Sequence, residues 1–290
     1  MSGKSSSRSG WVRLAAQAAI GGATRVSIDS SDRGLLFALG SWWLRLAYRN
    51  RPVPIGRLLF IRNFATCQDA LFPELQAIMS TGESLRNPLL ASILADMELG
   101  IWSLTPSTLN FLEQQIQILK PNLVLEFGSG VSTACVARYM KDLHGDPNRV
   151  YAISIEQELS FIERTSELLG ALQLGNNVRI VHSPLRQQTI EDVRTTCYDL
   201  SGDSVRAVLM DIRPDFVVID GPAAEPGARF GTLPLIRSFL SPGAWFFLDD
   251  ALRDAELKVA QLWSQLPAVR INGVYLSGKG LLVGQVGGGD

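Results

Sequence analysis

Three aspartates stand at the ends of two apolar segments, where their carboxylates could do chemistry together. Asp220 follows the run Phe216–Ile219, and the pair Asp249-Asp250 follows the run Ala244–Leu248. If both runs are parallel strands, the three side chains meet at the carboxyl edge of one sheet, where open α/β folds bind their ligands. Converging carboxylates repel one another unless a cation joins them or one keeps its proton. This pattern predicts a site for Mg²⁺ or a similar hard ion.

A glycine turn and two glutamates form a second candidate site. The apolar run Val124–Phe127 stops at the Gly-Ser-Gly turn of residues 128–130, and a helical pattern follows at once. A second apolar run ends in Glu156, at the spacing at which a strand–helix–strand unit presents an acid to a ribose. Thr133 stands where dinucleotide-binding proteins have their third glycine. Glu126, just before the turn, would repel a pyrophosphate but attract an ammonium and a sulfonium, which indicates S-adenosylmethionine.

These motifs resemble the class I S-adenosylmethionine-dependent methyltransferases. The similarity rests on LEFGSGVST at residues 125–133, on IEQ after the second apolar run, and on VVIDG and FFLDD. More narrowly, IDGPAAEPGARFGTLPLI at residues 219–236 and the segment GAWFFLDDALR are similar to a group of bacterial small-molecule O-methyltransferases. The resemblance covers residues 100–290 and implies methyl transfer to a hydroxyl of a small molecule.

The resemblance also implies which residues hold the cofactor. Glu126 and the turn are expected at its amino-acid end, Glu156 at both ribose hydroxyls, and Ser183 at the adenine. The implied cofactor-binding residues are Glu126, Gly128, Ser129, Gly130, Ser132, Thr133, Glu156, Ser183 and Asp220.

The acidic cluster is similar to that of catechol-type O-methyltransferases. In that group an Asp after the fourth strand and an Asp-Asn pair after the fifth bind a divalent metal. The resemblance implies that Asp220 and Asp249 are catalytic and that Asp220, Asp249 and Asp250 are metal ligands. The group commonly has a lysine three residues after the first Asp, where this chain has Ala223. No general base is therefore assigned, and the alternative that the aspartates only bind loop amides stays open.

Three arginines lie in or beside the loops that follow the predicted strands. Arg229, Arg237 and Arg253 could clamp an acidic or sugar substrate, or they could be ordinary surface arginines. The chain has two histidines, His144 and His182, and neither is expected to act as a base.

The predicted elements that position these residues alternate between strand and helix. Strands are expected near residues 124–127, 150–155, 178–182, 216–219 and 244–248, with a closing hairpin near 268–272 and 280–286. Helices are expected over 131–140, 157–170 and 254–263, and before the first strand with Thr105 as N-cap and Pro106 at the first position. A polar stretch that contains Tyr198 and Asp199 leads from the strand at 178–182 to Asp215, and no element is predicted within it. The fold class is α/β: a Rossmann-like, seven-stranded, mainly parallel sheet with an antiparallel last strand and a helical N-terminal extension.

The N-terminal part differs in charge from the rest of the chain. Residues 1–62 contain ten basic and two acidic residues, a net charge of +8, although the whole chain carries −1. We expect a basic, largely helical extension over residues 1–100 with a mobile tail at 1–10, followed by the S-adenosylmethionine-binding domain at 101–290. Helical patterns at 11–20 and 35–48 combine aromatic, leucine and arginine residues, which suits a peripheral membrane contact through residues 11–62 or packing onto the main domain. Further helical patterns cover 71–79 and 88–97.

Cysteine usage and hydropathy indicate the compartment. Cys67, Cys135 and Cys197 are odd in number and widely spaced, which argues against a disulfide framework or a zinc site. The longest apolar run, residues 34–44, is about half of a membrane span. A cytoplasmic location is expected, peripheral at a membrane if residues 11–62 bind one, and an organellar transit peptide stays open because residues 1–28 contain Ser and Arg and no acid.

Two other functions compete with methyl transfer. A dehydrogenase would use the Tyr-x-x-x-Lys pair Tyr275 and Lys279, but this pair falls in a turn and not on a helix. A non-catalytic, cofactor-binding module could attach to a membrane or an acidic partner through the basic extension. Nucleic acid is not the expected partner, because no RNA-module or base-reading motif accompanies the basic residues. The sequence leaves the acceptor and the oligomeric state undetermined.

Overall fold

The computed structural model describes residues 30–62, 84–94, 103–210 and 213–287. The predicted helices over 11–20 and 71–79, the tail at 1–10 and Cys67 lie outside these ranges. Among the described cysteines, Cys135 and Cys197 are both buried and free.

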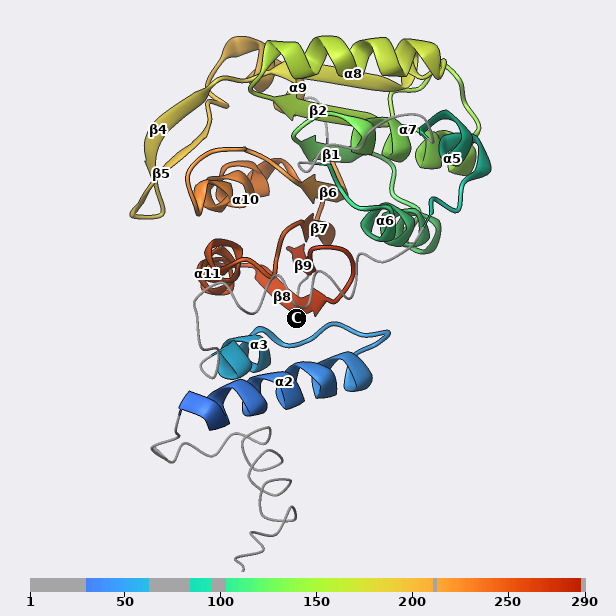
Figure 1. Cartoon of the computed structure of the whole chain (residues 1–290). Helices are drawn as coiled ribbons and strands as arrows, with labels where there is room; N and C mark the ends of the chain where they lie inside the picture. The colour runs from blue at the N-terminus through green and yellow to red at the C-terminus, as the bar shows by residue number, and fades with distance from the viewer. Residues whose placement is uncertain (1–29, 63–83, 95–102, 211–212, 288–290) are drawn as a thin grey trace, which may run out of the picture.

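A seven-stranded sheet runs through the middle of the molecule, in the order β3-β2-β1-β6-β7-β9-β8 (Figure 1). β9 is antiparallel to both of its neighbours, whereas the other adjacent pairs are parallel. The predicted fold class and the predicted closing hairpin are therefore confirmed. The strands are β1 (Val124–Phe127), β2 (Ala152–Glu156), β3 (Val178–His182), β6 (Phe216–Ile219), β7 (Ala244–Leu248), β8 (Val269–Tyr275) and β9 (Leu281–Val286).

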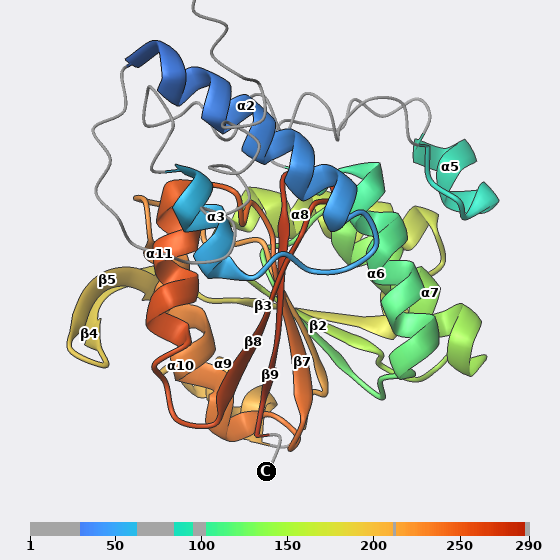
Figure 2. The ribbon, with the colours of Figure 1, turned by 90° about the horizontal axis from the view of Figure 1, so that it is seen from below.

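Two helical layers cover the two faces of this sheet (Figures 1 and 2). One core layer joins Val124 and Phe216 of the central strands to α6, α7 and α8. The other joins Leu125 and Val217 to α9, α10 and α11. Because β1 and β6 are buried along their whole length, they read as continuous apolar runs, interrupted only by Glu126. The helices are α6 (Pro106–Leu119), α7 (Val131–His144), α8 (Leu159–Ala171), α9 (Asp203–Met210), α10 (Thr232–Ile236) and α11 (Asp254–Trp263).

The helix before the first strand begins as its sequence predicts. Thr105 is the N-cap of α6, and its side chain accepts a hydrogen bond of 3.2 Å from the backbone N–H of Thr108. Pro106 stands in the first turn, where its missing N–H costs nothing. The short helix α5 (Pro88–Leu94) buries Leu90 against the same layer.

Residues 30–62 of the N-terminal extension pack on the β8 edge of the sheet (Figure 2). Val53 exchanges two backbone hydrogen bonds with Val274 of β8, of 2.7 and 2.9 Å. On either side of it, α2 (Ser30–Ala47) and α3 (Ile55–Arg62) bury Leu44 and Leu58 completely. Arg62 at the end of α3 forms an ion pair with Asp254 of α11. Packing onto the main domain, one of the two predicted interpretations, therefore describes part of this segment, and the predicted domain boundary at residue 100 stays a prediction.

The polar stretch between β3 and β6, for which the sequence predicts no element, contains ordered elements. β4 (Leu185–Ile190) and β5 (Val193–Tyr198) form a hairpin, and α9 follows it. The hairpin turns at Glu191 and Asp192, which have φ of 48° and 63°. A two-residue turn of this kind usually contains Asn or Gly, so the acidic pair carries no hairpin signal. The sequence therefore missed this hairpin and α9.

Candidate active site

The glycine turn joins β1 to the start of α7. The backbone N–H of Gly128 donates a hydrogen bond of 2.9 Å to Ile155 of the neighbouring strand, and its φ of 97° favours glycine. Thr133, one turn into α7, accepts a hydrogen bond of 3.0 Å from the backbone N–H of Gly130. The helix therefore starts with its free N–H groups at the turn, where they favour a negatively charged group.

Glu156 at the end of β2 is fixed by two backbone donors. Oε2 accepts a hydrogen bond of 2.7 Å from the N–H of Ser129, and Oε1 accepts one of 2.9 Å from the N–H of Glu158. The carboxylate is thereby tied to the glycine turn and buried at the edge of the sheet. Its remaining acceptor positions can receive two neighbouring hydroxyl groups in a defined geometry.

Glu126 is a buried carboxylate that the described residues leave without a hydrogen-bond partner. Burial raises the pKa of Glu126 to about 7, an effect that the nearby hydroxyls of Ser132 and Thr133 oppose in part. An unpaired buried carboxylate is costly to keep ionised, so this position favours a positively charged ligand group.

A cavity of about 1070 Å³ lies at the carboxyl edge, between the glycine turn and the loops after β2, β6 and β7. It contains most of the residues predicted for cofactor binding, together with the apolar side chains of Phe161 and Leu168. The predicted residues that line it are Gly128, Ser129, Gly130, Ser132, Glu156, Asp220 and Asp250. Glu126 and Thr133 are fully buried and are not among the residues that line the cavity.

Ser183 is not among the residues that line this cavity. Its side chain is fully buried, and its hydroxyl donates a hydrogen bond of 3.0 Å to the backbone oxygen of Asp199. Ser183 thus holds the chain after β3 to the loop after β5, and its assignment to the adenine stays a prediction.

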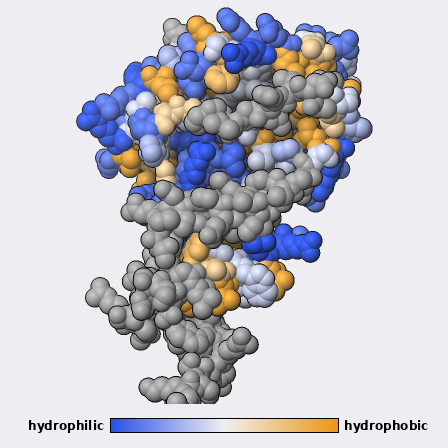
Figure 3. Space-filling model, viewed as in Figure 1, coloured by the Kyte–Doolittle hydropathy of each residue, from blue (hydrophilic) through white to orange (hydrophobic). Residues whose placement is uncertain are grey.

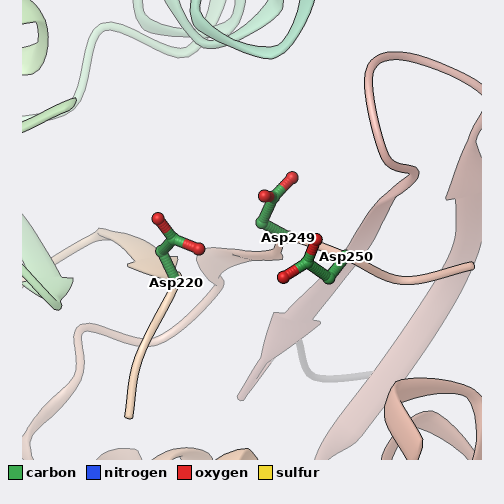
Figure 4. Close-up of side chains that lie close together, drawn as sticks. All are labelled: Asp220, Asp249 and Asp250. Atoms are coloured by element: carbon green, nitrogen blue, oxygen red, sulfur yellow. The ribbon is translucent and has the colours of Figure 1, made fainter. Parts of the chain in front are cut away.

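The three aspartates do converge, as their positions after β6 and β7 predict (Figure 4). Their nearest carboxylate oxygens all lie within 4.8 Å of one another. Asp220 and Asp250 line the cavity, whereas Asp249 does not, and the side chains of Asp249 and Asp250 are both buried. Burial raises the pKa of Asp220 and of Asp249, and the charges of the neighbouring aspartates raise it further.

Two cationic side chains lie in this cluster. Arg229, at the first turn after the β6 loop, is buried and lies 3.0 Å from Asp250 Oδ2 and 3.4 Å from Asp220 Oδ1. It also donates a hydrogen bond of 2.9 Å to the backbone oxygen of Asp249. Lys279 Nζ lies 3.3 Å from Asp250 Oδ1 and 3.7 Å from Asp249 Oδ2.

Sequence reasoning missed both of these roles. The sequence suggests that Arg229 binds an acidic or sugar substrate, but its guanidinium group already forms ion pairs with Asp220 and Asp250. Lys279 is suggested only as half of a dehydrogenase pair, and it does lie between β8 and β9 and not on a helix. No local signal connects either residue to the aspartates, because each contact depends on how the loops fold back. Arg253 adds a third cation, 3.0 Å from Asp250 Oδ2, but its side chain is more exposed.

The remaining candidates lie elsewhere or pair elsewhere. Arg237 forms an ion pair of 2.7 Å with Glu191, away from the cavity. His144 lies 2.7 Å from the backbone oxygen of Pro121, and His182 lies 3.1 Å from that of Gln157. Neither histidine lines the cavity.

The cluster can be compared with what a divalent ion requires. Carboxylate oxygens are suitable ligands for Mg²⁺, and Asp249 has no hydrogen-bond partner among the described residues for either oxygen. Both oxygens of Asp250, however, already face cations of the chain. A metal bound by all three aspartates would have to displace Lys279, so the predicted metal ligation stays a prediction.

Comparisons with known proteins agree with the motifs. Residues 125–251 match the family model of a methyltransferase domain. The fold is similar to cofactor-bound Rv0187 from MTB, at 18% identity and a TM-score of 0.52, over 75% of this chain and 98% of that one. It is also similar to the O-methyltransferase from Bacillus cereus in complex with SAH, at 16% identity and a TM-score of 0.51, over 74% and 98%. A third similar structure is the O-methyltransferase TomG from Streptomyces achromogenes in complex with SAM, at 15% identity and a TM-score of 0.50, over 77% and 100%. No curated protein gives a significant match.

At these identities the solved structures show the shared fold, and the family model adds the kind of domain. Residues 125–251 match a methyltransferase domain, and the seven-stranded sheet shares its fold with the solved methyltransferases. This confirms the family that the sequence motifs indicate. The acceptor and the roles of individual residues are matters for proposal.

Proposed function

We propose that this protein transfers a methyl group from S-adenosylmethionine to a hydroxyl of a small molecule. The observation that carries the proposal is the pair of glutamates beside one cavity. Glu156 is held rigidly by two backbone donors, and Glu126 is buried without a partner. A ligand with a vicinal diol and a nearby cation would satisfy both residues.

In this proposal each residue has a separate task in holding the cofactor. Glu156 accepts hydrogen bonds from the two ribose hydroxyls. Glu126 balances the positive charge of the amino-acid end, and the N–H groups at the start of α7 suit its carboxylate. When bound, the cofactor supplies an electrophilic methyl group on a sulfonium.

The acceptor is prepared by the loops after β6 and β7. The new bond joins the acceptor oxygen to the methyl carbon while the carbon–sulfur bond breaks, so the hydroxyl must lose a proton. Asp220 lines the cavity, and burial raises its pKa to about 6, which makes it a better proton acceptor than an ordinary aspartate. The charge of Asp250 contributes to this rise in pKa, whereas Asp249 is buried and does not line the cavity. Most of the remaining acceleration comes from alignment of the acceptor in the cavity.

A small acceptor agrees with the dimensions of the site. The cavity of about 1070 Å³ must contain the cofactor and the reacting part of the acceptor together. Two of the structurally similar proteins are described as O-methyltransferases, which favours a hydroxyl as the acceptor group.

Cofactor binding and turnover test this proposal separately. Calorimetry with S-adenosylhomocysteine is expected to show one site per chain, and tritiated S-adenosylmethionine is expected to label phenolic or catecholic acceptors. If no binding of the cofactor product is detected, the proposed function is wrong. Binding without transfer to any acceptor hydroxyl would instead support the alternative of a non-catalytic module.

We also propose a peripheral membrane contact through α2. None of the described helices is long and apolar enough to cross a membrane. Leu39, Trp42 and Leu46 are nevertheless 44%, 59% and 66% exposed, and Arg45 and Arg49 stand beside them. Hydrophobic surface gathers in the region of α2 and α3 (Figure 3). Such a helix suits the interface of an anionic membrane.

Vesicle binding tests the membrane contact. The protein is expected to sediment with vesicles containing phosphatidylserine and not with pure phosphatidylcholine vesicles. The variant Trp42→Ser/Leu46→Ser should lose this binding and keep its affinity for S-adenosylhomocysteine. Equal sedimentation of the variant and the unchanged protein would contradict the contact.

A further inference from the structure

We propose that Lys279, together with Arg229, takes the place of a divalent metal in the aspartate cluster, so that the protein binds no such ion there. The inference rests on the proposed function for its significance, because the cluster adjoins the acceptor. Its evidence is independent of the acceptor and consists of charge balance, contacts and the construction of one loop.

The charges of the cluster are already balanced by the chain. Asp220, Asp249 and Asp250 would carry three negative charges if all were ionised. Arg229 and Lys279 supply two positive charges within 3.7 Å of them, and Arg253 supplies a third at the rim. A divalent ion added to this arrangement would leave a net positive charge in a largely buried site, which costs desolvation energy without a counter-ion.

The contacts place Lys279 where a shared ion would have to lie. Its Nζ is near one oxygen of Asp250 and one of Asp249, at 3.3 and 3.7 Å, so it bridges the adjacent pair. On the other side of the cluster, Arg229 bridges Asp250 and Asp220. The three carboxylates are thus linked in sequence by two cations of the chain.

The loop between β8 and β9 holds Lys279 in this position. The backbone oxygens of Lys279 and Gly280 accept hydrogen bonds of 3.4 and 2.9 Å from Leu252 and Ala251, which directly follow the Asp249-Asp250 pair. The lysine backbone is therefore fixed to the same loop as the two aspartates. An ammonium held by the adjacent loop is a structural part of the cluster and not an incidental surface charge.

The two glycines that flank Lys279 allow this close approach. Gly278 and Gly280 have φ of 55° and 87°, which side chains rarely adopt. A Cβ at Gly278 would overlap the hydroxyls of Thr105 and Thr108, and one at Gly280 would lie 2.5 Å from Cγ of Leu252. The Gly-Lys-Gly sequence thus lets the loop pack against α6 on one side and the β7 loop on the other.

In methyl transfer, Lys279 then acts as a positioning residue. It keeps Asp249 and Asp250 in place and offsets their charge, while Asp220, which is paired with Arg229, faces the cavity. No step of the transfer requires an added metal ion.

Binding of Mn²⁺, followed by electron paramagnetic resonance, tests the inference without knowledge of the acceptor. The full chain is compared with Lys279→Ala, Lys279→Gln and the double variant Lys279→Ala/Asp249→Asn. The unchanged protein is expected to bind no Mn²⁺ in the cluster at millimolar concentration. Lys279→Ala and Lys279→Gln should bind Mn²⁺ at least about tenfold more tightly, because a nearby positive charge is gone. The added Asp249→Asn change should abolish that binding.

Two results would overturn the inference. One is micromolar Mn²⁺ binding by the unchanged protein that Asp249→Asn removes, which would establish the metal site instead. The other is a folded Lys279→Ala or Lys279→Gln protein that gains no Mn²⁺ affinity. Calorimetry with S-adenosylhomocysteine on the same samples reports on the proposed function alone, so failure of one idea can be distinguished from failure of the other.

Discussion

The backbone N–H of Ser129 donates a hydrogen bond of 2.7 Å to Oε2 of Glu156, which ties the glycine turn after β1 to the end of β2. The two residues are 27 positions apart in the chain. The bond fixes the carboxylate before any ligand arrives, so little ordering cost remains for binding.

Replacement of Glu156 by glutamine should therefore weaken cofactor binding. An amide can accept only through one atom, and its NH₂ group would face the N–H of Ser129 or Glu158. We expect affinity for S-adenosylhomocysteine to fall roughly 10- to 100-fold, the loss typical of charged hydrogen bonds. Calorimetry measures the change, and Glu158→Gln, whose side chain is exposed, is the matched control. An unchanged affinity for Glu156→Gln would exclude Glu156 from the site.

Glu126 should make the ligand-free protein less stable as pH rises. Burial raises its pKa from 4.5 to about 7 in the folded state, so the folded state binds the proton more tightly than the unfolded chain does. Stability contributed by this proton is present at pH 4.5 and is lost as pH rises towards 7. Above pH 7 the cost is about 3 kcal/mol, because a tenfold difference in proton affinity between the two states corresponds to about 1.4 kcal/mol.

The variant Glu126→Gln tests this cost and the role of the charge together. At pH 8 it should be more stable to urea than the unchanged protein, by up to about 3 kcal/mol. The difference should fall to less than about 1 kcal/mol at pH 5. Its affinity for S-adenosylhomocysteine should nevertheless fall, because the ammonium loses its counter-charge. Glu163→Gln on the exposed face of α8 is the control, and a Glu126→Gln protein that is less stable at pH 8 would contradict the prediction.

The sequence predicts the strands that are buried on both faces and the helices with a regular apolar period. β1 and β6 are covered on both faces, so they appear as apolar runs between turn residues, and their ends were placed correctly. α11 was predicted with its observed bounds because its apolar period and its first acid are both local signals. The β4–β5 hairpin was missed because its exposed strands are polar and its turn lacks glycine.

The same difference between local and long-range signals explains which parts of the site were predicted. The cofactor side was predictable because Glu126, the turn and Glu156 belong to one strand–helix–strand unit. The neutralisation of the aspartates was not, since Asp249 and Lys279 come from loops separated by α11 and β8. Ser183 was assigned from family position alone, and its burial against the chain at Asp199 reflects the missed β5 segment.

We expect Gly221 to tolerate no side chain because a Cβ would clash with Tyr198. A second substitution at Tyr198 should relieve this clash. A Cβ there would overlap the hydroxyl of Tyr198 and would lie 3.2 Å from the backbone nitrogen of Gly128. Gly221→Ala should destabilise the protein by about 1–3 kcal/mol, as overpacking does. Adding Tyr198→Phe should recover part of this loss, because the hydroxyl is buried and makes no hydrogen bond with the described residues.

Urea unfolding of the single and double variants measures this coupling. Gly175→Ala is the control, because a Cβ at Gly175 meets nothing within 4 Å. Additive effects of Gly221→Ala and Tyr198→Phe would show that the hydroxyl is not the obstacle.

Arg229 should be required for stability at neutral pH and less so in acid. Arg229→Met leaves Asp220 and Asp250 without their shared guanidinium, and removal of one partner from a buried ion pair typically costs about 3–5 kcal/mol. The folded-state pKa values of Asp220 and Asp249, already raised by burial, should then rise further. Their protons bind the folded state more tightly than the unfolded chain, so stability is regained as pH falls from 8 towards 5. Urea unfolding at pH 8 and at pH 5 measures the change in the free energy of unfolding. Arg237→Met is the control, because its more exposed ion pair with Glu191 should contribute less than about 1 kcal/mol. A loss of equal size at pH 8 and pH 5 would mean that Arg229 acts through packing and not through its charge.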